Sequence, residues 1–386
     1  MKPRAIRLRV SLAVVFLVVL LVPTAASPAV PGVNQTSAYG IGSLRAEYLA
    51  ELEPFDLGLM GEAGLRTYRA RFRQDQVVDA GGGYTQWGRL DNLARLASLQ
   101  GVTLLPVLIN LPGDLAYVPP RDPASREAFA SFAAAAARRY GTFGSFWPTC
   151  GCPYRPARVF EVWNEPNHGT FWPNANPGEY AALLQAVKPR VRRADPTARI
   201  LFGGLATPAK PDATRLDPSA FLAAVINAAG RNAFDAVGVH NYSNYSRSPS
   251  VDVDTLLKAV GGVVSTLQAN AGTGPGGRPR QQVWIGELGR YLTPDPDPAK
   301  QAASEQDQRA FAEMATDRLV ANRSAWNLGP ISWYAMRDAP VATQPYERLG
   351  LRRTNAEDTD AGPKPSWDAY TARSASAAPL PLPTLR

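Results

Sequence analysis

The chain has 386 residues and a formal net charge of +8, but Lys2, Arg4, Arg7 and Arg9 supply half of that charge, so residues 27–386 carry only +4. Four more basic residues crowd the end of one predicted helix, where they complement the helix dipole and stay solvated: Lys188, Arg190, Arg192 and Arg193. Such a cluster is more typical of a solvated face than of a nucleic-acid site, so we expect no nucleic-acid partner. With only two histidines and two cysteines, the composition also disfavours a zinc site and other metal-dependent chemistry.

The first 26 residues have the pattern of a secretory signal peptide. The basic residues precede an uncharged apolar run over 10–22 and the small residues Thr24, Ala25 and Ala26, after which we expect cleavage. This run is shorter than the roughly 20 residues that a membrane span needs, so the mature protein is predicted to be secreted, with no stable membrane association. The alternative is an uncleaved signal that anchors the chain. Residues 27–35 are interpreted as a short linker.

Short apolar runs alternate with amphipathic segments through the rest of the chain. The runs predict eight strands, near 37–41, 65–70, 103–108, 159–163, 200–203, 236–240, 283–287 and 331–335. Apolar residues at three- and four-residue spacing predict helices between them, over 86–100, 125–140, 177–194, 218–229 and 253–270. This alternation is typical of a parallel α/β sheet.

The predicted strands and helices form a single domain over 36–373, although the length alone would allow two domains. A Gly/Pro-rich loop over 272–279 precedes the seventh strand, and residues 374–386, rich in Ser, Ala and Pro, are predicted to be disordered. The cysteines, Cys150 and Cys152, flank Gly151 in a predicted loop. Export permits a disulfide between them, and the sequence leaves open whether it forms.

A first carboxylate of interest lies in the segment EVWNEPN over 161–167. The apolar, β-branched and aromatic run before it predicts a strand, and Pro166 cannot continue a hydrogen-bonded ladder. Glu165 is therefore expected at the carboxyl end of a strand, which is where a catalytic acid is presented in parallel α/β proteins.

A second short apolar run also ends in a glutamate. The segment QVWIGELG over 282–289 contains Glu287, 122 residues after Glu165. At about 30 to 40 residues for each strand-helix unit, this distance is three units, which places the two glutamates on the fourth and seventh of eight strands. The two motifs together resemble those of glycoside hydrolases of clan A, with families 5 and 39 as the nearest likeness. The resemblance covers nearly all of the mature chain and implies a (β/α)8 TIM barrel.

The same resemblance implies roles for both glutamates. Glu165 would be the acid/base and Glu287 the nucleophile of a retaining glycosidase, which needs two carboxyl groups about 5 to 5.5 Å apart. The alternative is that both are strand-end glutamates paired to arginines. Asn164 matches the residue that binds the sugar 2-hydroxyl, and capping of the loop is its alternative role.

Two further segments resemble parts of the clan's substrate site. Arg69, in AGLRTYR over 63–69, would support the nucleophile and lower the pKa of Glu287, although Arg66 and Arg71 are close in sequence. In VGVHNY over 237–242, Tyr242 would donate to the nucleophile and His240 would line the sugar site; a structural histidine is the alternative.

Tryptophans provide candidate platforms for sugar rings. Trp333, in ISWYAMRD over 331–338, is the candidate floor of the site that holds the cleaved sugar, with packing in the barrel as the alternative. Trp172 is a candidate secondary platform, whereas Trp163 and Trp284 are interpreted as packing residues. The role of His168 is left open.

The resemblance thus predicts a secreted retaining glycosidase that uses two glutamates, no cofactor and no metal, and that acts on a carbohydrate substrate with β-linked sugars. The alternatives are a carbohydrate-binding barrel without catalysis and a transglycosylase that uses the same residues. Loops after the strands decide the sugar, the linkage and endo or exo action, so these stay open, as do the exact family and the oligomeric state.

Overall fold

The computed structural model describes residues 35–36, 39–42, 53–112, 116–208, 210–243, 248–292, 304–339, 348–355, 359–375 and 377–386. They all belong to one compact unit, Asn34–Arg386. The predicted signal peptide, 1–26, and all of the predicted linker except Gln35 lie outside the described residues. None of the helices in the described part of the chain combines the length and apolar character needed to cross a membrane.

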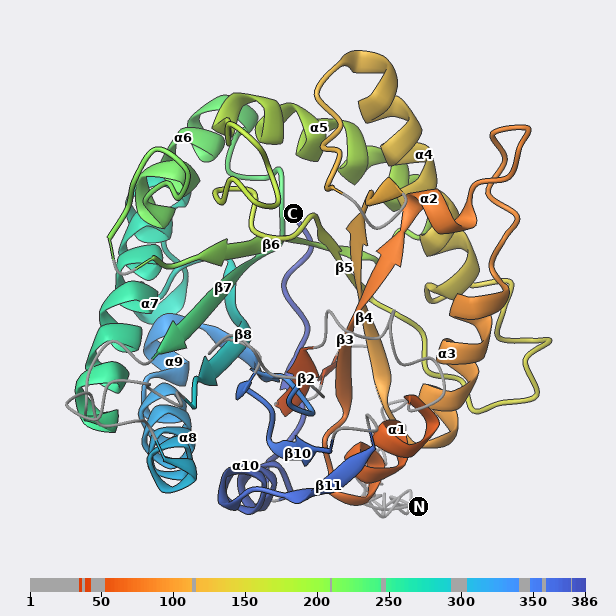
Figure 1. The fold of residues 1–386 in the computed structure, drawn as a ribbon. Coiled ribbons are helices and arrows are strands. Elements are labelled where there is room, and N and C mark those ends of the chain that lie inside the picture. Colours follow the sequence, from red (N-terminus) through yellow and green to blue (C-terminus); the bar gives the residue numbers. More distant parts are fainter. Residues whose placement is uncertain are drawn as a thin grey trace, which may run out of the picture. The chain divides into compact units, whose positions relative to one another are not determined.

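Seven parallel strands form a curled sheet at the centre of this unit (Figure 1). They are β3 (Thr67–Arg73), β4 (Thr103–Ile109), β5 (Val159–Val162), β6 (Arg199–Ala206), β7 (Ala236–Ser243), β8 (Gln282–Arg290) and β9 (Leu328–Tyr334), hydrogen-bonded in chain order. The short β2 (Tyr39–Gly42) pairs in parallel with both β3 and β9, so the strand order is closed. Nearly every side chain of β5, β6 and β8 is buried, as expected for parallel strands covered on both faces.

Helices surround the strands in Figure 1. The longer ones are α1 (Glu53–Glu62), α3 (Gly88–Leu99), α4 (Pro123–Tyr140), α5 (Pro177–Ala194), α6 (Pro218–Ala229), α7 (Pro249–Ala271), α8 (Glu305–Ala321) and α10 (Pro365–Ala375). Short helices are α2 (Gln74–Val77), α9 (Arg323–Trp326) and a 3₁₀ turn over Pro275–Gly277. A proline in the first turn of α4 to α7 is favourable because its missing N–H would have no helical partner there. The predicted alternation of strands and helices is confirmed.

Two small antiparallel pairs lie beside the main sheet. β1 (Gln35–Thr36) pairs with β12 (Leu380–Pro381), and β10 (Arg352–Thr354) pairs with β11 (Asp360–Pro363). The first pair joins the two ends of the compact unit. In the predicted loop over 150–152, Cys150 and Cys152 form a disulfide, which answers the question that the sequence leaves open.

The hydrophobic core has two parts. The larger part lies between the strands and the helices and includes Phe160 and Ile200. The smaller part consists of one residue from each of the strands β4 to β8 and one residue of the C-terminal segment: Leu105, Val159, Leu201, Ala236, Trp284 and Leu382. Because neighbouring side chains on a strand point to opposite faces, this second cluster fills the inside of the curled sheet.

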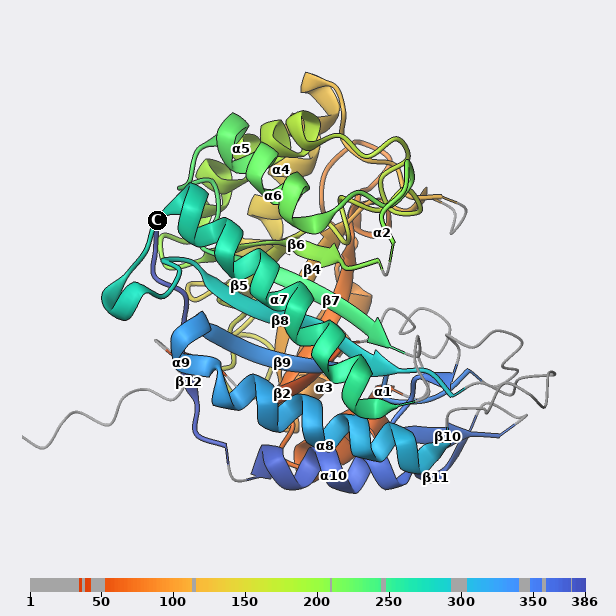
Figure 2. The same cartoon turned by 90° about the vertical axis from the view of Figure 1, so that its left-hand side faces the viewer.

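The C-terminal segment makes defined contacts, so the prediction of disorder over 374–386 is wrong for its described residues. Leu382 is buried in the inner cluster, and the carbonyl of Pro383 accepts a hydrogen bond of 2.9 Å from Nε of Arg199. The backbone N–H of Arg386 donates to Asp235 at 2.8 Å. Figure 2 shows this end of the chain on the side opposite to the arrowheads of β6 and β7. The Ser/Ala/Pro composition carries no signal for these contacts because tertiary packing creates them.

The basic cluster at the end of α5 is also less solvated than predicted. Lys188 is buried and donates to Asp235 at 3.0 Å, and Arg192 donates to the same carboxylate at 2.9 Å. Asp235 is buried at the start of β7, so these two cations serve as its partners. Arg190 instead pairs with Glu127 on the surface of α4.

Candidate active site

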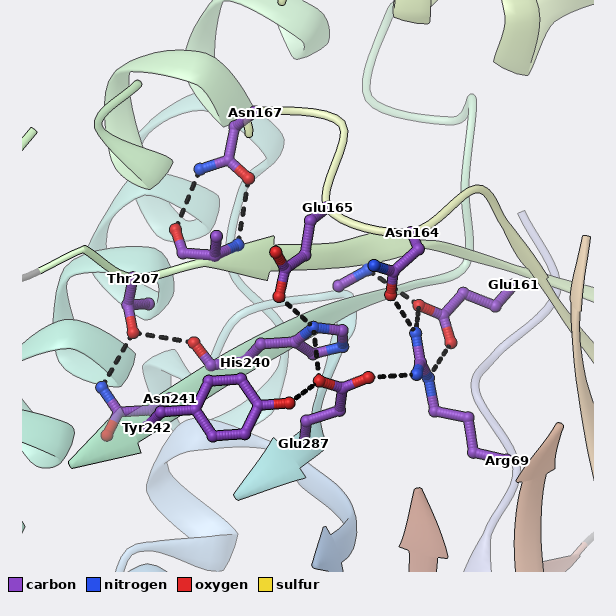
Figure 3. Close-up of polar contacts among 12 residues, drawn as sticks. Arg69, Glu161, Asn164, Glu165, Asn167, Thr207, His240, Asn241, Tyr242 and Glu287 are labelled. Atoms are coloured by element: carbon purple, nitrogen blue, oxygen red, sulfur yellow. Dashed lines mark hydrogen bonds and ion pairs between the residues drawn. The ribbon is translucent and has the colours of Figure 1, made fainter. Parts of the chain in front are cut away.

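Four strands bring the predicted site residues together (Figure 3). Arg69 comes from β3, Glu165 follows β5, His240 and Tyr242 come from β7, and Glu287 comes from β8. His240 lies directly opposite Glu287 in the register of β7 and β8. Residues far apart in sequence are thus neighbours because parallel strands end at the same edge of a sheet.

Arg69 lies at the centre of the polar network. It is fully buried, and its Nη1 donates to Glu287 at 2.5 Å. Its Nη2 donates to Oδ1 of Asn164 at 2.8 Å. The structure therefore selects Arg69 from the three arginines that the sequence offers. Arg66 instead donates to the backbone carbonyl of Gly61, away from this network.

Glu165 and Glu287 face each other across His240. A carboxylate oxygen of each glutamate and a ring nitrogen of His240 all lie within 4.8 Å of one another. Nδ1 of His240 is 2.9 Å from Oε1 of Glu165 and 3.4 Å from Oε2 of Glu287. The hydroxyl of Tyr242 donates to Oε2 of Glu287. Glu287 thus has two donors, Arg69 and Tyr242, whereas Glu165 contacts the imidazole of His240.

Burial has the largest effect on the pKa values of Glu165 and Glu287. Burial raises the pKa of Glu165 well above its usual range, and the negative charge of Glu287 adds to this rise. Burial also raises the pKa of Glu287, to about 7, although Arg69 acts in the opposite direction. The predicted effect of Arg69 is therefore present, but the loss of solvation outweighs it, so the pKa of Glu287 rises overall. Both carboxyl groups therefore hold a proton to higher pH than an exposed glutamate does.

His240 is held as a neutral ring in a tight space. Burial lowers its pKa well below the usual range, and the positive charge of Arg69 contributes. A Cβ atom on Gly204 would come within 1.9 Å of Nε2 of His240, so the position beside the ring requires a glycine. This close approach fixes where Nδ1 points, between the two glutamates.

The loop that carries Glu165 has an unusual backbone. Trp163 has φ of 71° and Glu165 has φ of 41°, in the left-handed region that non-glycine residues rarely adopt. Asn167 ties the loop to β6, since its amide exchanges hydrogen bonds with the backbone of Ala206 at 3.0 and 2.9 Å. Backbone strain of this kind persists where surrounding contacts hold it, and it is common at functional sites.

Two buried polar atoms in the network have no hydrogen-bond partner among the described residues: Nδ2 of Asn164 and Nε2 of His240. A buried donor without a partner costs about 1–3 kcal/mol. The Asn164 amide is thus able to bind an incoming polar group, since its oxygen is already occupied by Arg69.

Trp333 does not belong to the site, and its predicted role as a sugar platform is wrong. Its side chain is fully buried, its Nε1 donates to the carbonyl of Leu349 at 2.8 Å, and its ring packs against Phe311 of α8 and Tyr370 of α10. It therefore points outward from β9 to the helices. The next residue, Tyr334, points the other way and lies with its ring 5.6 Å from that of Tyr242.

The other predicted aromatic roles are mostly those of packing. Trp163 and Trp284 are buried, as predicted. Trp172 is also buried, with Nε1 donating to Glu179 at 3.1 Å, so it is not an open secondary platform. His168 accepts a hydrogen bond from the N–H of Thr170 in the loop beyond Glu165.

Two residues of this network are not among the predicted ones. Tyr334 is adjacent to the predicted Trp333, and only the inward or outward direction of β9 distinguishes them. Glu161 is fully buried and makes two hydrogen bonds to Arg69. The sequence signal for it is a charged residue inside an otherwise apolar strand, four residues before Glu165.

Glu165, His240 and Glu287 also present the donor types of a metal site. Both oxygens of Glu287 already accept hydrogen bonds, from Arg69 and Tyr242. Paired carboxyl groups in this arrangement are able to support proton transfer and nucleophilic attack.

Solved structures with a similar fold include glycoside hydrolases. A family 39 glycoside hydrolase from the gut symbiont Bacteroides cellulosilyticus WH2 has a TM-score of 0.64 and 19% identity, over 89% of this chain and 64% of that one. A monomeric β-xylosidase from Caulobacter crescentus CB15 has a TM-score of 0.62 and 20% identity, over 90% of this chain and 70% of that one. A family 51 α-L-arabinofuranosidase from Bifidobacterium longum has a TM-score of 0.61 and 12% identity, over 90% and 74%.

This chain therefore spans less than two thirds of the length of the first of these structures. No protein-family model matches the sequence, and no curated protein does. At these identities the comparison is one of fold. The predicted resemblance to clan A glycoside hydrolases, with family 39 enzymes among the structural neighbours, is confirmed at the level of the fold.

Proposed function

We propose that this protein is a glycoside hydrolase that cleaves a glycosidic bond with net retention, using Glu165 and Glu287. The observation that carries the proposal is the closeness of the two carboxylates, since one oxygen of Glu165 lies within 4.8 Å of one oxygen of Glu287. Retaining glycosidases need about 5 to 5.5 Å between the carboxyl groups, whereas inverting enzymes need about 6.5 to 9.5 Å to admit a water molecule.

The different neighbours of the two glutamates support a different catalytic role for each. Glu287 accepts hydrogen bonds from Arg69 and Tyr242, which favour its ionised form and suit a nucleophile. Glu165 has a pKa raised well above its usual range, which suits a general acid. Glu165 would protonate the leaving oxygen while Glu287 bonds to the anomeric carbon; Glu165 would then take a proton from the water that releases the sugar.

Other residues of the network would bind the sugar. The unpartnered Nδ2 of Asn164 would donate to the 2-hydroxyl, a contact that strengthens in the transition state. Tyr334 would provide an aromatic wall beside the nucleophile, in the role predicted for Trp333. His240 would orient Glu165 rather than exchange protons with bulk solvent, because it is buried and its pKa is lowered.

The substrate class and the setting of the reaction complete the proposal. Among the structural neighbours are enzymes described as a β-xylosidase and an exo-β-1,4-mannosidase, so we propose a β-linked glycoside as the substrate. We also propose that the closed strand order is a full (β/α)8 barrel in a single domain and that the predicted signal directs the chain out of the cell.

A panel of aryl β-glycosides and polysaccharides, incubated with the purified protein, tests this proposal. Hydrolysis is expected for at least one, and Glu287→Ala should abolish it because the attacking atom is lost. Added azide should restore cleavage of an activated aryl glycoside in this variant and give a glycosyl azide of inverted configuration. Glu62→Ala, at an exposed glutamate of α1, is the control and should keep full activity.

Three results would contradict the proposal. Full activity of Glu287→Ala would remove the nucleophile assignment. Binding of the sugars without turnover would indicate a carbohydrate-binding protein. Products longer than the substrate, formed in preference to hydrolysis when an acceptor sugar is added, would indicate a transglycosylase.

A further inference from the structure

A third carboxylate, that of Glu161, shares Arg69 as a partner with Glu287. Glu161 is on β5, four residues before Glu165, and its side chain is fully buried. Its Oε2 accepts from Nε of Arg69 at 2.7 Å and its Oε1 accepts from Nη2 of Arg69 at 2.9 Å. The backbone N–H of Gly204 on β6 also donates to Oε1, at 2.8 Å. Three strands therefore hold this carboxylate in one place.

The two hydrogen bonds from Arg69 fix the plane of its guanidinium group. A guanidinium that binds a carboxylate through two parallel N–H groups has a defined orientation as well as a strong contact. With Nε and Nη2 directed to Glu161, Nη1 is left to reach Glu287 at 2.5 Å. Nη2 also reaches Oδ1 of Asn164 at 2.8 Å. One orientation of Arg69 thus serves both Glu287 and Asn164, and Glu161 sets it (Figure 3).

Glu161 also changes the balance of charge. Arg69 is the cation in contact with both Glu161 and Glu287, and Glu165 is close to the same group. The other titratable or charged side chains that face this cluster in the described residues are Arg71 on β3, Tyr180 on α5, and His240 and Tyr242 on β7. The negative charge of Glu161 raises the pKa of both Glu165 and Glu287, against the effect of Arg69.

We propose that Glu161 is a positioning residue for the reaction: it directs Arg69 toward Glu287 and Asn164 and offsets part of the positive charge of Arg69 beside Glu165. This inference rests on the proposed function of the same site. Without Glu161, Arg69 could turn its paired N–H groups toward Glu287, which would hold the nucleophile more tightly and leave Asn164 without its partner.

Two substitutions separate position from charge. Glu161→Gln keeps the shape, removes the charge and leaves one oxygen to accept from Arg69. Both limbs of the dependence of kcat/KM on pH should then move to lower pH by about one unit, the size typical of a neighbouring charge. Glu161→Asp keeps the charge, but its shorter side chain places the carboxylate farther from Arg69. We expect its kcat to fall by about 100-fold through misplacement of Arg69, with a pH profile closer to that of the unsubstituted protein.

Asp235→Asn provides the matched control. Asp235 is also a buried carboxylate with cationic partners, but it lies at the start of β7, at the opposite ends of the strands. This variant should lose thermal stability and leave the pH profile unchanged. A Glu161→Gln protein that folds and has the kcat and both pH limbs of the unsubstituted protein would overturn the inference. A Glu161→Asp variant with full kcat would overturn the positioning part.

A second measurement does not depend on activity. Carbon NMR of glutamate carboxyl groups, assigned with Glu165→Gln and Glu287→Gln, gives the titration midpoints of the pair directly. Glu161→Gln should lower both midpoints, and unchanged midpoints would overturn the inference. If no glycoside is cleaved but the midpoints fall, the proposed function fails while the placement of Glu161 in the charge network holds.

Discussion

Glu165 and Glu287 are the same residue type at the same depth, and their neighbours make them different. Arg69 and Tyr242 both donate to Glu287, whereas Glu165 lies against the neutral ring of His240. Two titratable groups whose surroundings separate their pKa values can act as acid and base at one pH. This difference between the two carboxyl groups is the basis of the proposed mechanism.

The pH dependence of activity should reflect this pair. Glu287 must be ionised to attack and has a pKa of about 7, so kcat/KM should fall about tenfold for each pH unit below that value. Glu165 must be protonated, and its raised pKa moves the basic limb upward. A profile of kcat/KM on an aryl glycoside should therefore be bell-shaped with a near-neutral maximum. Full activity at pH 4.5 would contradict it.

Glu165→Gln should stabilise the protein while it removes acid catalysis. A pKa that is higher in the folded than in the unfolded state favours folding only while the carboxyl group is protonated. The stability contribution is therefore present below the unfolded pKa and is lost as the pH rises toward the folded one. Gln does not ionise, so its gain in unfolding free energy should be roughly 1–2 kcal/mol larger at pH 7.5 than at pH 4.5.

Thermal unfolding at the two pH values measures this difference. The exposed Glu62→Gln variant is the control, and its melting temperature should differ little from that of the unsubstituted protein at either pH. A Glu165→Gln gain that is equal at both pH values would show that the folded protein does not raise the pKa of Glu165.

Substitution of Trp333 should lower stability, whereas substitution of Tyr334 should mainly weaken substrate binding. Trp333→Phe loses the hydrogen bond to Leu349 and leaves a cavity between β9 and the helices, so it should destabilise the fold by about 1–3 kcal/mol with KM unchanged. Tyr334→Leu should raise KM about tenfold through loss of an aromatic sugar contact, with a smaller effect on stability. A raised KM for Trp333→Phe without loss of stability would restore the platform assignment.

At the scale of the elements, the order and approximate positions of the strands could be predicted from the sequence, but the directions of their side chains could not. The apolar runs before Glu165 and Glu287 mark two strands, although β5 ends at Val162 and β8 continues to Arg290. The direction of Trp333 depends on the register of β9 against its neighbours, which the local sequence leaves undetermined because both alternate positions are apolar or aromatic. Glu161 was not predicted because its partner, Arg69, lies on another strand.

The C-terminal segment is an element whose order comes from tertiary contacts alone. Leu382→Ala should lower the free energy of unfolding by about 2–3 kcal/mol, because Leu382 fills the inner cluster below the strands. Leu385→Ala, at an exposed leucine three residues on, should change it by less than about 0.5 kcal/mol. Chemical denaturation compares the two. Equal, small losses would support the disorder that the composition suggests.

At the scale of the whole molecule, the parallel sheet explains how residues of four strands form one site. The strand order closes through β2, and β3, β5, β7 and β8 present Arg69, Glu165, His240 and Glu287 to one another. The spacing of 122 residues between the glutamates predicts their strands because each strand-helix unit has a similar length. The net direction of the pKa shift of Glu287 was not predictable, since it depends on burial within the folded chain.

The configuration of the first product tests the central claim most directly. Proton NMR of the anomeric signals, recorded in the first minutes of hydrolysis of an aryl β-glycoside, distinguishes the two products before the free sugar equilibrates. Carboxylates within 4.8 Å predict that the β-anomer forms first, by two displacements at the anomeric carbon. Initial formation of the α-anomer would show a single displacement by water and would contradict the roles assigned to Glu165 and Glu287.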